Sequence, residues 1–247
     1  MVDLTKRAGT AQGAIISLLK READRGVDLG EITARVVVAI DYSASMRARY
    51  ENGEVQDLVE RVLALSLAGL DDDGDIQVHF FHNEPFSSEV VDSGSYAGFV
   101  DRWRQRRDMG GTNYGGVIKA ILAEAGHAKL GLGKRLFGRG GQEPAGPAAI
   151  PTLVLFVTDG EPWDKDETKR LLVDASSKPV FWQFLGLGYA PKFLEDLDTM
   201  SGRTVDNVGL TSMGDSKATP DETWFPTVLE EYVTSWTPAA RQAGLIV

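Results

Sequence analysis

Apolar runs that do not alternate with polar residues constrain the fold of this sequence more than any other feature. Such runs lie within residues 35–41, 152–160 and 179–188. Strands that alternate have one face in water, whereas unbroken apolar strands are typical of a parallel sheet buried on both faces. Amphipathic helical patterns separate the runs, as at residues 54–70. The sequence therefore predicts an α/β fold: a Rossmann-like, doubly wound, mostly parallel central sheet flanked by helices.

The remaining segments continue this alternation of strands and helices. Residues 76–82 predict a second strand, 84–91 a short edge strand, and 203–210 the last strand. Helices are expected between the strands and at the C-terminus. The C-terminal helix is indicated by an apolar stripe of Leu229, Tyr232, Val233 and Trp236.

Changes in composition along the chain predict its domain organisation. We expect residues 31–247 to form a single domain and residues 1–30 an N-terminal extension, in which 13–24 fit either a helix or an added edge strand. Residues 130–149 contain six glycines and two prolines, which is typical of a loop. Because this loop leads into the start of a strand, we expect it within the domain, away from the carboxyl ends of the strands.

Composition excludes several classes of function. The chain has no cysteine, which excludes disulfides, thiol catalysis and thiolate-bound zinc. Its formal net charge of −10 argues against a nucleic-acid partner. The basic segment 101–107 is interpreted as the solvated face of a helix, with a polyanion site as the alternative. No stretch approaches the roughly 20 apolar residues that span a bilayer, and the N-terminus lacks the apolar core of a signal peptide. We therefore expect a cytoplasmic protein.

Three polar clusters follow predicted strands or lie in a glycine-rich turn. In open α/β sheets the ligand crevice lies beyond the carboxyl ends of the strands, so we expect the clusters to meet there. All of them offer oxygen and none contains histidine, which favours a hard cation such as Mg²⁺, Mn²⁺ or Ca²⁺. The alternate spacing within residues 41–45 directs three side-chain oxygens to one side. The clusters consist of Asp41, Ser43 and Ser45, of Thr112, and of Thr158 and Asp159.

Short motifs in these clusters resemble those of a known family. "DYSAS" at 41–45, "GGTNY" at 110–114 and "VTDG" at 157–160 resemble the metal-ion-dependent adhesion site of von Willebrand factor A (vWA) domains. Ala44 stands where that site commonly has glycine. The resemblance implies a vWA fold with a divalent-ion site at the end of the sheet.

Longer matches resemble the vWA domains of the bacterial tellurium-resistance (Ter) stress-response group. They include "VTDGEPWDK" at 157–165 and "VFWQFLGLG" at 180–188. This resemblance implies a cytoplasmic protein that works beside calcium-binding Ter proteins in resistance to tellurite, phage or other stress.

The vWA resemblance also implies a mechanism and a set of ligands. An ion held mainly by neutral hydroxyls keeps positive character and an open position, which a partner's Asp or Glu carboxylate fills. We therefore expect a metal-dependent protein-interaction module and not an enzyme, with Mg²⁺ as the cofactor and Mn²⁺ or Ca²⁺ as alternatives. The expected ligands are the hydroxyls of Ser43, Ser45 and Thr112, with the carboxylates of Asp41 and Asp159 acting through water.

Two other interpretations stay open at the level of sequence. A buried strand that ends in aspartate also begins the haloacid-dehalogenase phosphotransferases, but position 43 is serine where those enzymes have a second aspartate. The other alternative is a scaffold whose metal site is vestigial. Beside the expected site, Asp164 is predicted to cap a helix N-terminus and Trp163 to contact a partner.

Overall fold

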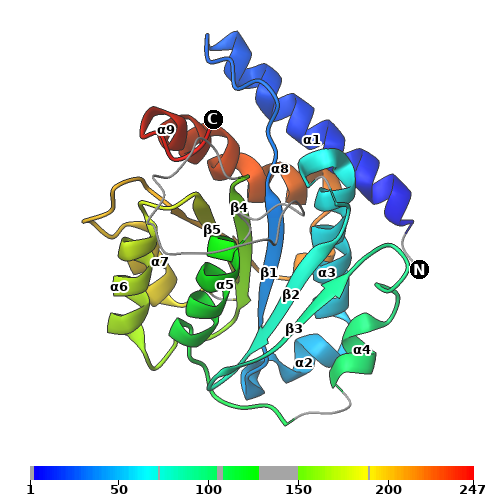
Figure 1. Cartoon of the computed structure of the whole chain (residues 1–247). Coiled ribbons are helices and arrows are strands. Elements are labelled where there is room, and N and C mark those ends of the chain that lie inside the picture. Colours follow the sequence, from blue (N-terminus) through cyan, green and yellow to red (C-terminus); the bar gives the residue numbers. More distant parts are fainter. Residues whose placement is uncertain (1–2, 72, 105–107, 128–149, 189) are drawn as a thin grey trace, which may run out of the picture.

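A computed structural model describes residues 3–71, 73–104, 108–127, 150–188 and 190–247. Within them, six strands form one sheet in the order β3-β2-β1-β4-β5-β6 (Figure 1). Neighbouring strands are parallel except β3, which runs antiparallel to β2 at one edge. The fold class predicted from the sequence is therefore confirmed. The strands are β1 (Arg35–Asp41), β2 (Ile76–Phe81), β3 (Pro85–Val91), β4 (Thr152–Thr158), β5 (Val180–Leu187) and β6 (Val208–Met213).

Helices cover both faces of this sheet. In Figure 1, α5, α6 and α7 lie on one face, and α1, α3 and α4 lie on the other. α8 joins this second group and continues through a π-helical turn at Tyr232–Trp236 into α9. The helices are α1 (Leu4–Asp24), α2 (Arg47–Glu51), α3 (Glu54–Leu65), α4 (Phe99–Arg104), α5 (Gly115–His127), α6 (Lys165–Ala175), α7 (Lys192–Asp198), α8 (Asp221–Glu231) and α9 (Thr237–Gln242).

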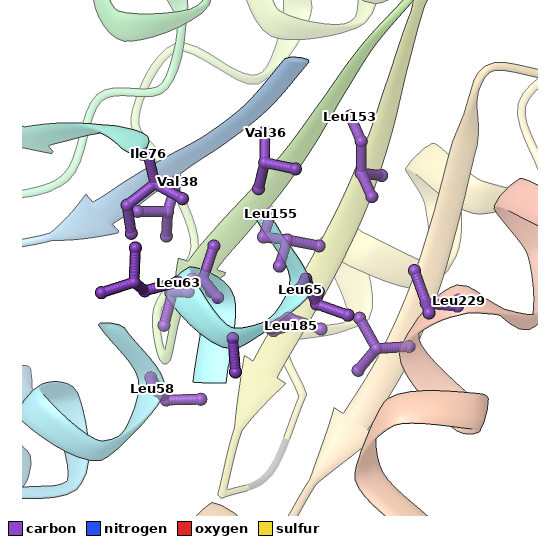
Figure 2. Close-up of a cluster of buried hydrophobic side chains, with 14 of the residues drawn as sticks. Val36, Val38, Leu58, Leu63, Leu65, Ile76, Leu153, Leu155, Leu185 and Leu229 are labelled. Carbon is purple, nitrogen blue, oxygen red and sulfur yellow. The ribbon is translucent and has the colours of Figure 1, made fainter. Parts of the chain in front are cut away.

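The two layers of helices explain why the central strands are almost entirely apolar. In β1, Val36 and Val38 face the core beneath α3 and α8, whereas Val37 and Ala39 face the core beneath α5 and α6. Figure 2 shows the first of these cores, in which leucines of α3 and α8 pack against side chains of β1, β4 and β5. Successive side chains of a strand point to opposite faces, so a sheet covered on both faces favours apolar residues at successive positions, with Gln183 of β5 and His79 of β2 as buried polar exceptions.

Most sequence predictions of individual elements agree with the structure. Residues 84–91 contain the edge strand β3, and residues 13–24 lie in a helix, α1, rather than in an edge strand. The helix expected at 54–70 ends at Leu65 and continues as a π-helical turn, Ser66–Leu70. The loop expected at 130–149 and residues 105–107 of the basic segment lie outside the described residues.

The prediction of the last strand was wrong in its position. The strand was expected at 203–210, but β6 runs from Val208 to Met213. Asn207 lies before the strand, where its side-chain amide donates a hydrogen bond to the backbone oxygen of Leu172 at 3.0 Å. The strand continues instead through Thr211 and Ser212. Polar side chains are tolerated there because β6 is the edge of the sheet and is partly exposed.

A buried ion-pair network fixes α1 to the rest of the fold. The side chain of Arg7 is only 5% exposed, and its guanidinium contacts Asp57 of α3 at 2.8 Å and Asp221 of α8 at 2.9 Å. Arg61 of α3 contacts the same two carboxylates, each at 3.1 Å. Glu60 of α3 adds a third carboxylate, 3.6 Å from Arg7, so two cations and three anions join three helices that are far apart in sequence.

Replacing Arg7 with methionine is expected to lower the free energy of unfolding by about 3 kcal/mol, because Asp57 and Asp221 then share Arg61 and Glu60 loses its ion pair with Arg7. Chemical denaturation measures this change.

The matched control is Arg21→Met on the same helix: its partner Glu230 is exposed, and its second partner, the buried Glu22, keeps an ion pair with Arg25 at 2.9 Å, so the effect should be much smaller. Equal effects of the two substitutions would show that the network does not anchor α1.

Candidate metal centre

The candidate site lies where the order of strands changes direction. From β1 the chain builds the sheet toward β2 and β3, and it then crosses to β4 on the other side of β1. Ile40 of β1 pairs with Val157 of β4, so the residues that follow these two strands emerge side by side. In doubly wound sheets, ligand sites lie at this kind of switch point.

Asp41 is the most deeply buried member of the site. It has no exposed surface, and its Oδ1 accepts a hydrogen bond from the backbone N–H of Ser43 at 2.8 Å. Its Oδ2 accepts one from the Thr158 hydroxyl at 2.7 Å. Burial raises the pKa of Asp41 to about 7, and the nearby charge of Asp159 adds to the rise. An ionised Asp41 is therefore a poorly solvated anion that a bound cation would stabilise.

The two serines connect β1 to the end of β4. The hydroxyl oxygens of Ser43 and Ser45 lie 3.0 Å apart. The Ser45 hydroxyl in turn donates to Oδ1 of Asp159 at 2.7 Å. Ala44, between the serines, begins a 3₁₀ turn, and alanine adopts this right-handed conformation without strain. The turn that follows Ser43, rather than an extended alternation, therefore brings the two serine oxygens together.

Thr112 approaches the same place from the glycine-rich turn. The turn pairs with the chain after β1: Ala44 donates its N–H to the backbone oxygen of Gly110 at 3.0 Å. The Thr112 hydroxyl lies 3.8 Å, and the Ser45 hydroxyl 3.9 Å, from the point that a side-chain carbon on Gly160 would occupy. The structure thus brings together all five residues expected from the sequence: Asp41, Ser43, Ser45, Thr112 and Asp159.

The glycines of the turn are required by close packing. A side-chain carbon on Gly110 would lie 2.9 Å from the ring of His82. One on Gly111 would lie 2.7 Å from Asn83 Oδ1 and from the ring of Trp163. Both contacts are shorter than ordinary van der Waals contact, so a larger residue at either position would displace the turn that carries Thr112.

Asp164 occupies the predicted N-cap position of a helix, but its carboxylate bonds to the start of another helix. It occupies the N-cap position of α6, but its carboxylate makes no capping hydrogen bond there. It accepts instead from the backbone N–H groups of Tyr114 at 3.0 Å and Gly115 at 2.7 Å, where α5 begins. The sequence predicts the N-cap position but not the bonds to α5, because the two helix starts lie side by side, which local sequence does not reveal. The cap ties the Thr112 turn to the chain after β4.

Arg49 and Glu54 border the site and carry no motif that would identify them. Arg49 Nε lies 3.4 Å from Oδ2 of Asp159, and its Nη1 donates to Glu54 Oε2 at 2.8 Å. Glu54 is 2% exposed and also accepts hydrogen bonds from the backbone N–H and the hydroxyl of Ser216. Gly188, with φ +74°, leaves room for the guanidinium, because a side-chain carbon there would lie 2.5 Å from Arg49 Nη2.

The donor set fits a hard divalent ion bound largely through hydroxyls. Among the residues that the structure describes, no group of three or more His, Cys, Asp or Glu side chains is placed to hold a metal. A metal here would therefore depend on the three hydroxyls in addition to the two carboxylates. Oxygen donors of this kind suit Mg²⁺, Mn²⁺ or Ca²⁺. A bound cation would also stabilise the negative charge of the buried Asp41.

Comparison with known proteins identifies the family. The chain matches the model for the TerF-like vWA family, described as the vWA domain found in the TerF C terminus, over residues 33–132 and 141–246. The chain therefore belongs to the TerF-like family of vWA domains, which confirms the resemblance seen in the sequence.

Individual relatives include both bacterial and eukaryotic proteins. The chain is 30% identical over 223 residues to the uncharacterized protein YcbR of Bacillus subtilis (strain 168), covering 88% of this chain and 83% of YcbR. It is 28% identical over 159 residues to Copine-C of Dictyostelium discoideum, covering 58% of this chain and 27% of Copine-C. The solved SpRpn10 VWA domain gives a TM-score of 0.48 at 15% identity, covering 88% of this chain and 99% of that one.

The raised pKa of Asp41 predicts a pH dependence of stability in the metal-free protein. The pKa is 3.8 without burial and about 7 in the folded state, so between these values only the folded state keeps the proton. The free energy of unfolding should fall as pH rises through this window, by about 4 kcal/mol in total, and should level off above pH 7.

Urea denaturation in EDTA at pH 5 and pH 8 measures this effect, with Asp41→Asn as the variant that lacks the carboxyl. Glu231, whose pKa burial also raises to about 7, contributes equally to both proteins and cancels in the comparison. The wild type should lose more stability than the variant between the two pH values. An identical loss in both would show that Asp41 is not the group responsible.

Proposed function

We propose that this chain is a protein-interaction module in which a divalent ion at the end of the sheet binds an acidic side chain of a partner protein. The observation that carries the proposal is the connected set of oxygens that runs from Asp41 through Ser43 and Ser45 to Asp159, with Thr112 beside it. Membership of the vWA family supports an interaction role, and the donor set supports the ion.

The proposal assigns the residues different roles. The ion would be held by the neutral hydroxyl oxygens of Ser43, Ser45 and Thr112. The carboxylates of Asp41 and Asp159 would supply negative charge through water molecules. When bound, the ion would supply a positively charged open position that accepts a carboxylate. Mg²⁺ is the proposed ion, with Mn²⁺ and Ca²⁺ as alternatives.

The position of the hydroxyls favours binding at the surface. Ser45 is exposed, whereas Ser43 and Thr112 are 3% and 7% exposed. A partner would therefore meet the site from the side of Ser45. Trp163 is 77% exposed and packs against Gly111 of the same turn, so it offers an aromatic contact next to the ion. Exposed aromatic residues beside a polar anchor are common centres of binding energy.

The enzyme alternative is less well supported by the geometry. A nucleophilic Asp41 would need an oxygen directed at the substrate, but both of its oxygens accept hydrogen bonds and neither is exposed. A second aspartate for proton transfer is also missing, since position 43 is serine. A scaffold with a vestigial site stays the main alternative, and ion binding separates it from the proposal.

The family relationship extends the proposal to a biological setting. The matching domain is described from the C terminus of TerF, so we assign the interaction to tellurium resistance or a related stress response in the cytoplasm, with other Ter-type proteins as partners. Within the described residues, no helix has the length and apolar character needed to cross a membrane.

Ion-dependent stability and capture together test the function. Mg²⁺ should raise the melting temperature of the wild type relative to EDTA, because an ion that binds only the folded state stabilises it. Asp159→Asn should weaken Mg²⁺ binding by at least about tenfold, as loss of a supporting carboxylate does at other metal sites. Partner proteins captured on the immobilised wild-type chain should be lost with EDTA and with Asp159→Asn.

The matched control is Asp166→Asn, which removes the same charge from an exposed position in the first turn of α6. This variant should retain both Mg²⁺ binding and capture. If Mg²⁺ had no effect on the wild type, the vestigial-site interpretation would hold. If capture survived both EDTA and Asp159→Asn, the partner would bind another surface.

A further inference from the structure

The contacts of Arg49 raise the question of why a cation lies at the border of a cation site. Arg49 forms an ion pair with the buried Glu54, and the Arg49 side chain is 19% exposed. Its Nε is directed to Asp159 at 3.4 Å, within ion-pair distance. A positive charge here opposes ion binding by ordinary electrostatics, so its position calls for an explanation other than metal affinity.

Glu54 and Gly188 fix the guanidinium and limit how far it reaches. Glu54 holds Nη1 at 2.8 Å, and Nη2 lies over Gly188, where a side chain would collide with it. Glu54 is itself held by the hydroxyl of Ser216 at 2.9 Å and by the backbone N–H of Ser216 at 3.2 Å. Arg49 is therefore a fixed charge that contacts the edge of the site without entering it.

The two oxygens of Asp159 consequently have different surroundings. Oδ1 accepts the Ser45 hydroxyl at 2.7 Å, on the side of the proposed ion. Oδ2 is directed to Arg49. An arginine close to a carboxylate offsets part of its negative charge and fixes its orientation, which keeps Asp159 from acting as a strong direct ligand.

We propose that Arg49 is a positioning residue that adjusts the charge of the ion site, weakening ion binding while preserving the positive character that attracts a carboxylate. This inference rests on the proposed function. A site whose carboxylates are fully available would bind the ion more tightly but leave it nearly neutral. By neutralising Asp159 in part, Arg49 would shift the site toward recognition of an acidic partner.

The proposal predicts opposite effects on two ligands. Arg49→Gln keeps a hydrogen-bond donor but removes the charge, so Mg²⁺ should bind at least about threefold more tightly, as measured by calorimetry. Acetate, used as the carboxylate probe, should bind the Mn²⁺-loaded variant at least about threefold more weakly, as followed by water-proton relaxation. Arg49→Lys keeps the charge without the planar guanidinium. Its affinities for Mg²⁺ and for acetate should therefore lie between those of Arg49→Gln and the wild type.

Two further variants sharpen the test. Glu54→Gln removes the competing anion and leaves Arg49 more available to Asp159, so Mg²⁺ should bind more weakly than to the wild type. Arg47→Gln removes an equal charge from an exposed neighbour on the same helix. It should change neither the Mg²⁺ affinity nor the acetate affinity by more than about twofold. Thermal melts in EDTA confirm that each variant is folded.

The outcomes separate this inference from the proposed function. If the wild type bound no Mg²⁺ at all, the proposed ion site itself would be wrong. If the wild type bound Mg²⁺ and acetate but Arg49→Gln changed both in the same direction, or neither, the role of Arg49 would be wrong and the ion site would stand. Loss of both ligands together in a folded variant would indicate a purely structural role for Arg49.

Discussion

The structure of the site depends on one buried carboxylate. Asp41 lies at the end of the central strand with no exposed surface, and it is held between the Ser43 N–H and the Thr158 hydroxyl. These two hydrogen bonds join the chain after β1 to the end of β4, which is the switch point of the sheet. Because an anion in this position is poorly solvated, the surrounding residues must supply either a proton or a cation. The serines, Thr112 and Asp159 are arranged in a way that suits a cation.

Charged side chains around the site join the segments that follow the strands, each through a separate polar contact. Asp164 joins the Thr112 turn to the chain after β4 through the start of α5. Arg49 joins Asp159 to Glu54, and Glu54 joins both to Ser216, between β6 and α8. The loops at the carboxyl end of the sheet are thereby held to one another by polar contacts. Such contacts position a ligand set more accurately than apolar packing of loops would, because each has a preferred direction.

The sequence predicts the parts of this arrangement that obey a local rule. The buried strands follow from unbroken apolar runs, and the convergence of Asp41, Thr112 and Asp159 follows from their places at strand ends or in a tight turn. Residues whose role depends on distant partners were not predictable in this way. Nothing near Arg49 indicates Asp159, which is 110 positions away, and nothing near Asp164 indicates that α5 begins beside it. The strand β6 was misplaced for a related reason: its bounds depend on pairing with β5, where Thr211 lies opposite Leu185 and Ser212 opposite Gly186.

The central claim is that oxygens from three separate segments hold one divalent ion. The most direct measurement is anomalous X-ray scattering from crystals of the protein grown with Mn²⁺. The account predicts one strong peak within coordination distance of the hydroxyl oxygens of Ser43, Ser45 and Thr112. A map without a peak at that position, from crystals that contain Mn²⁺ at saturating concentration, would contradict it.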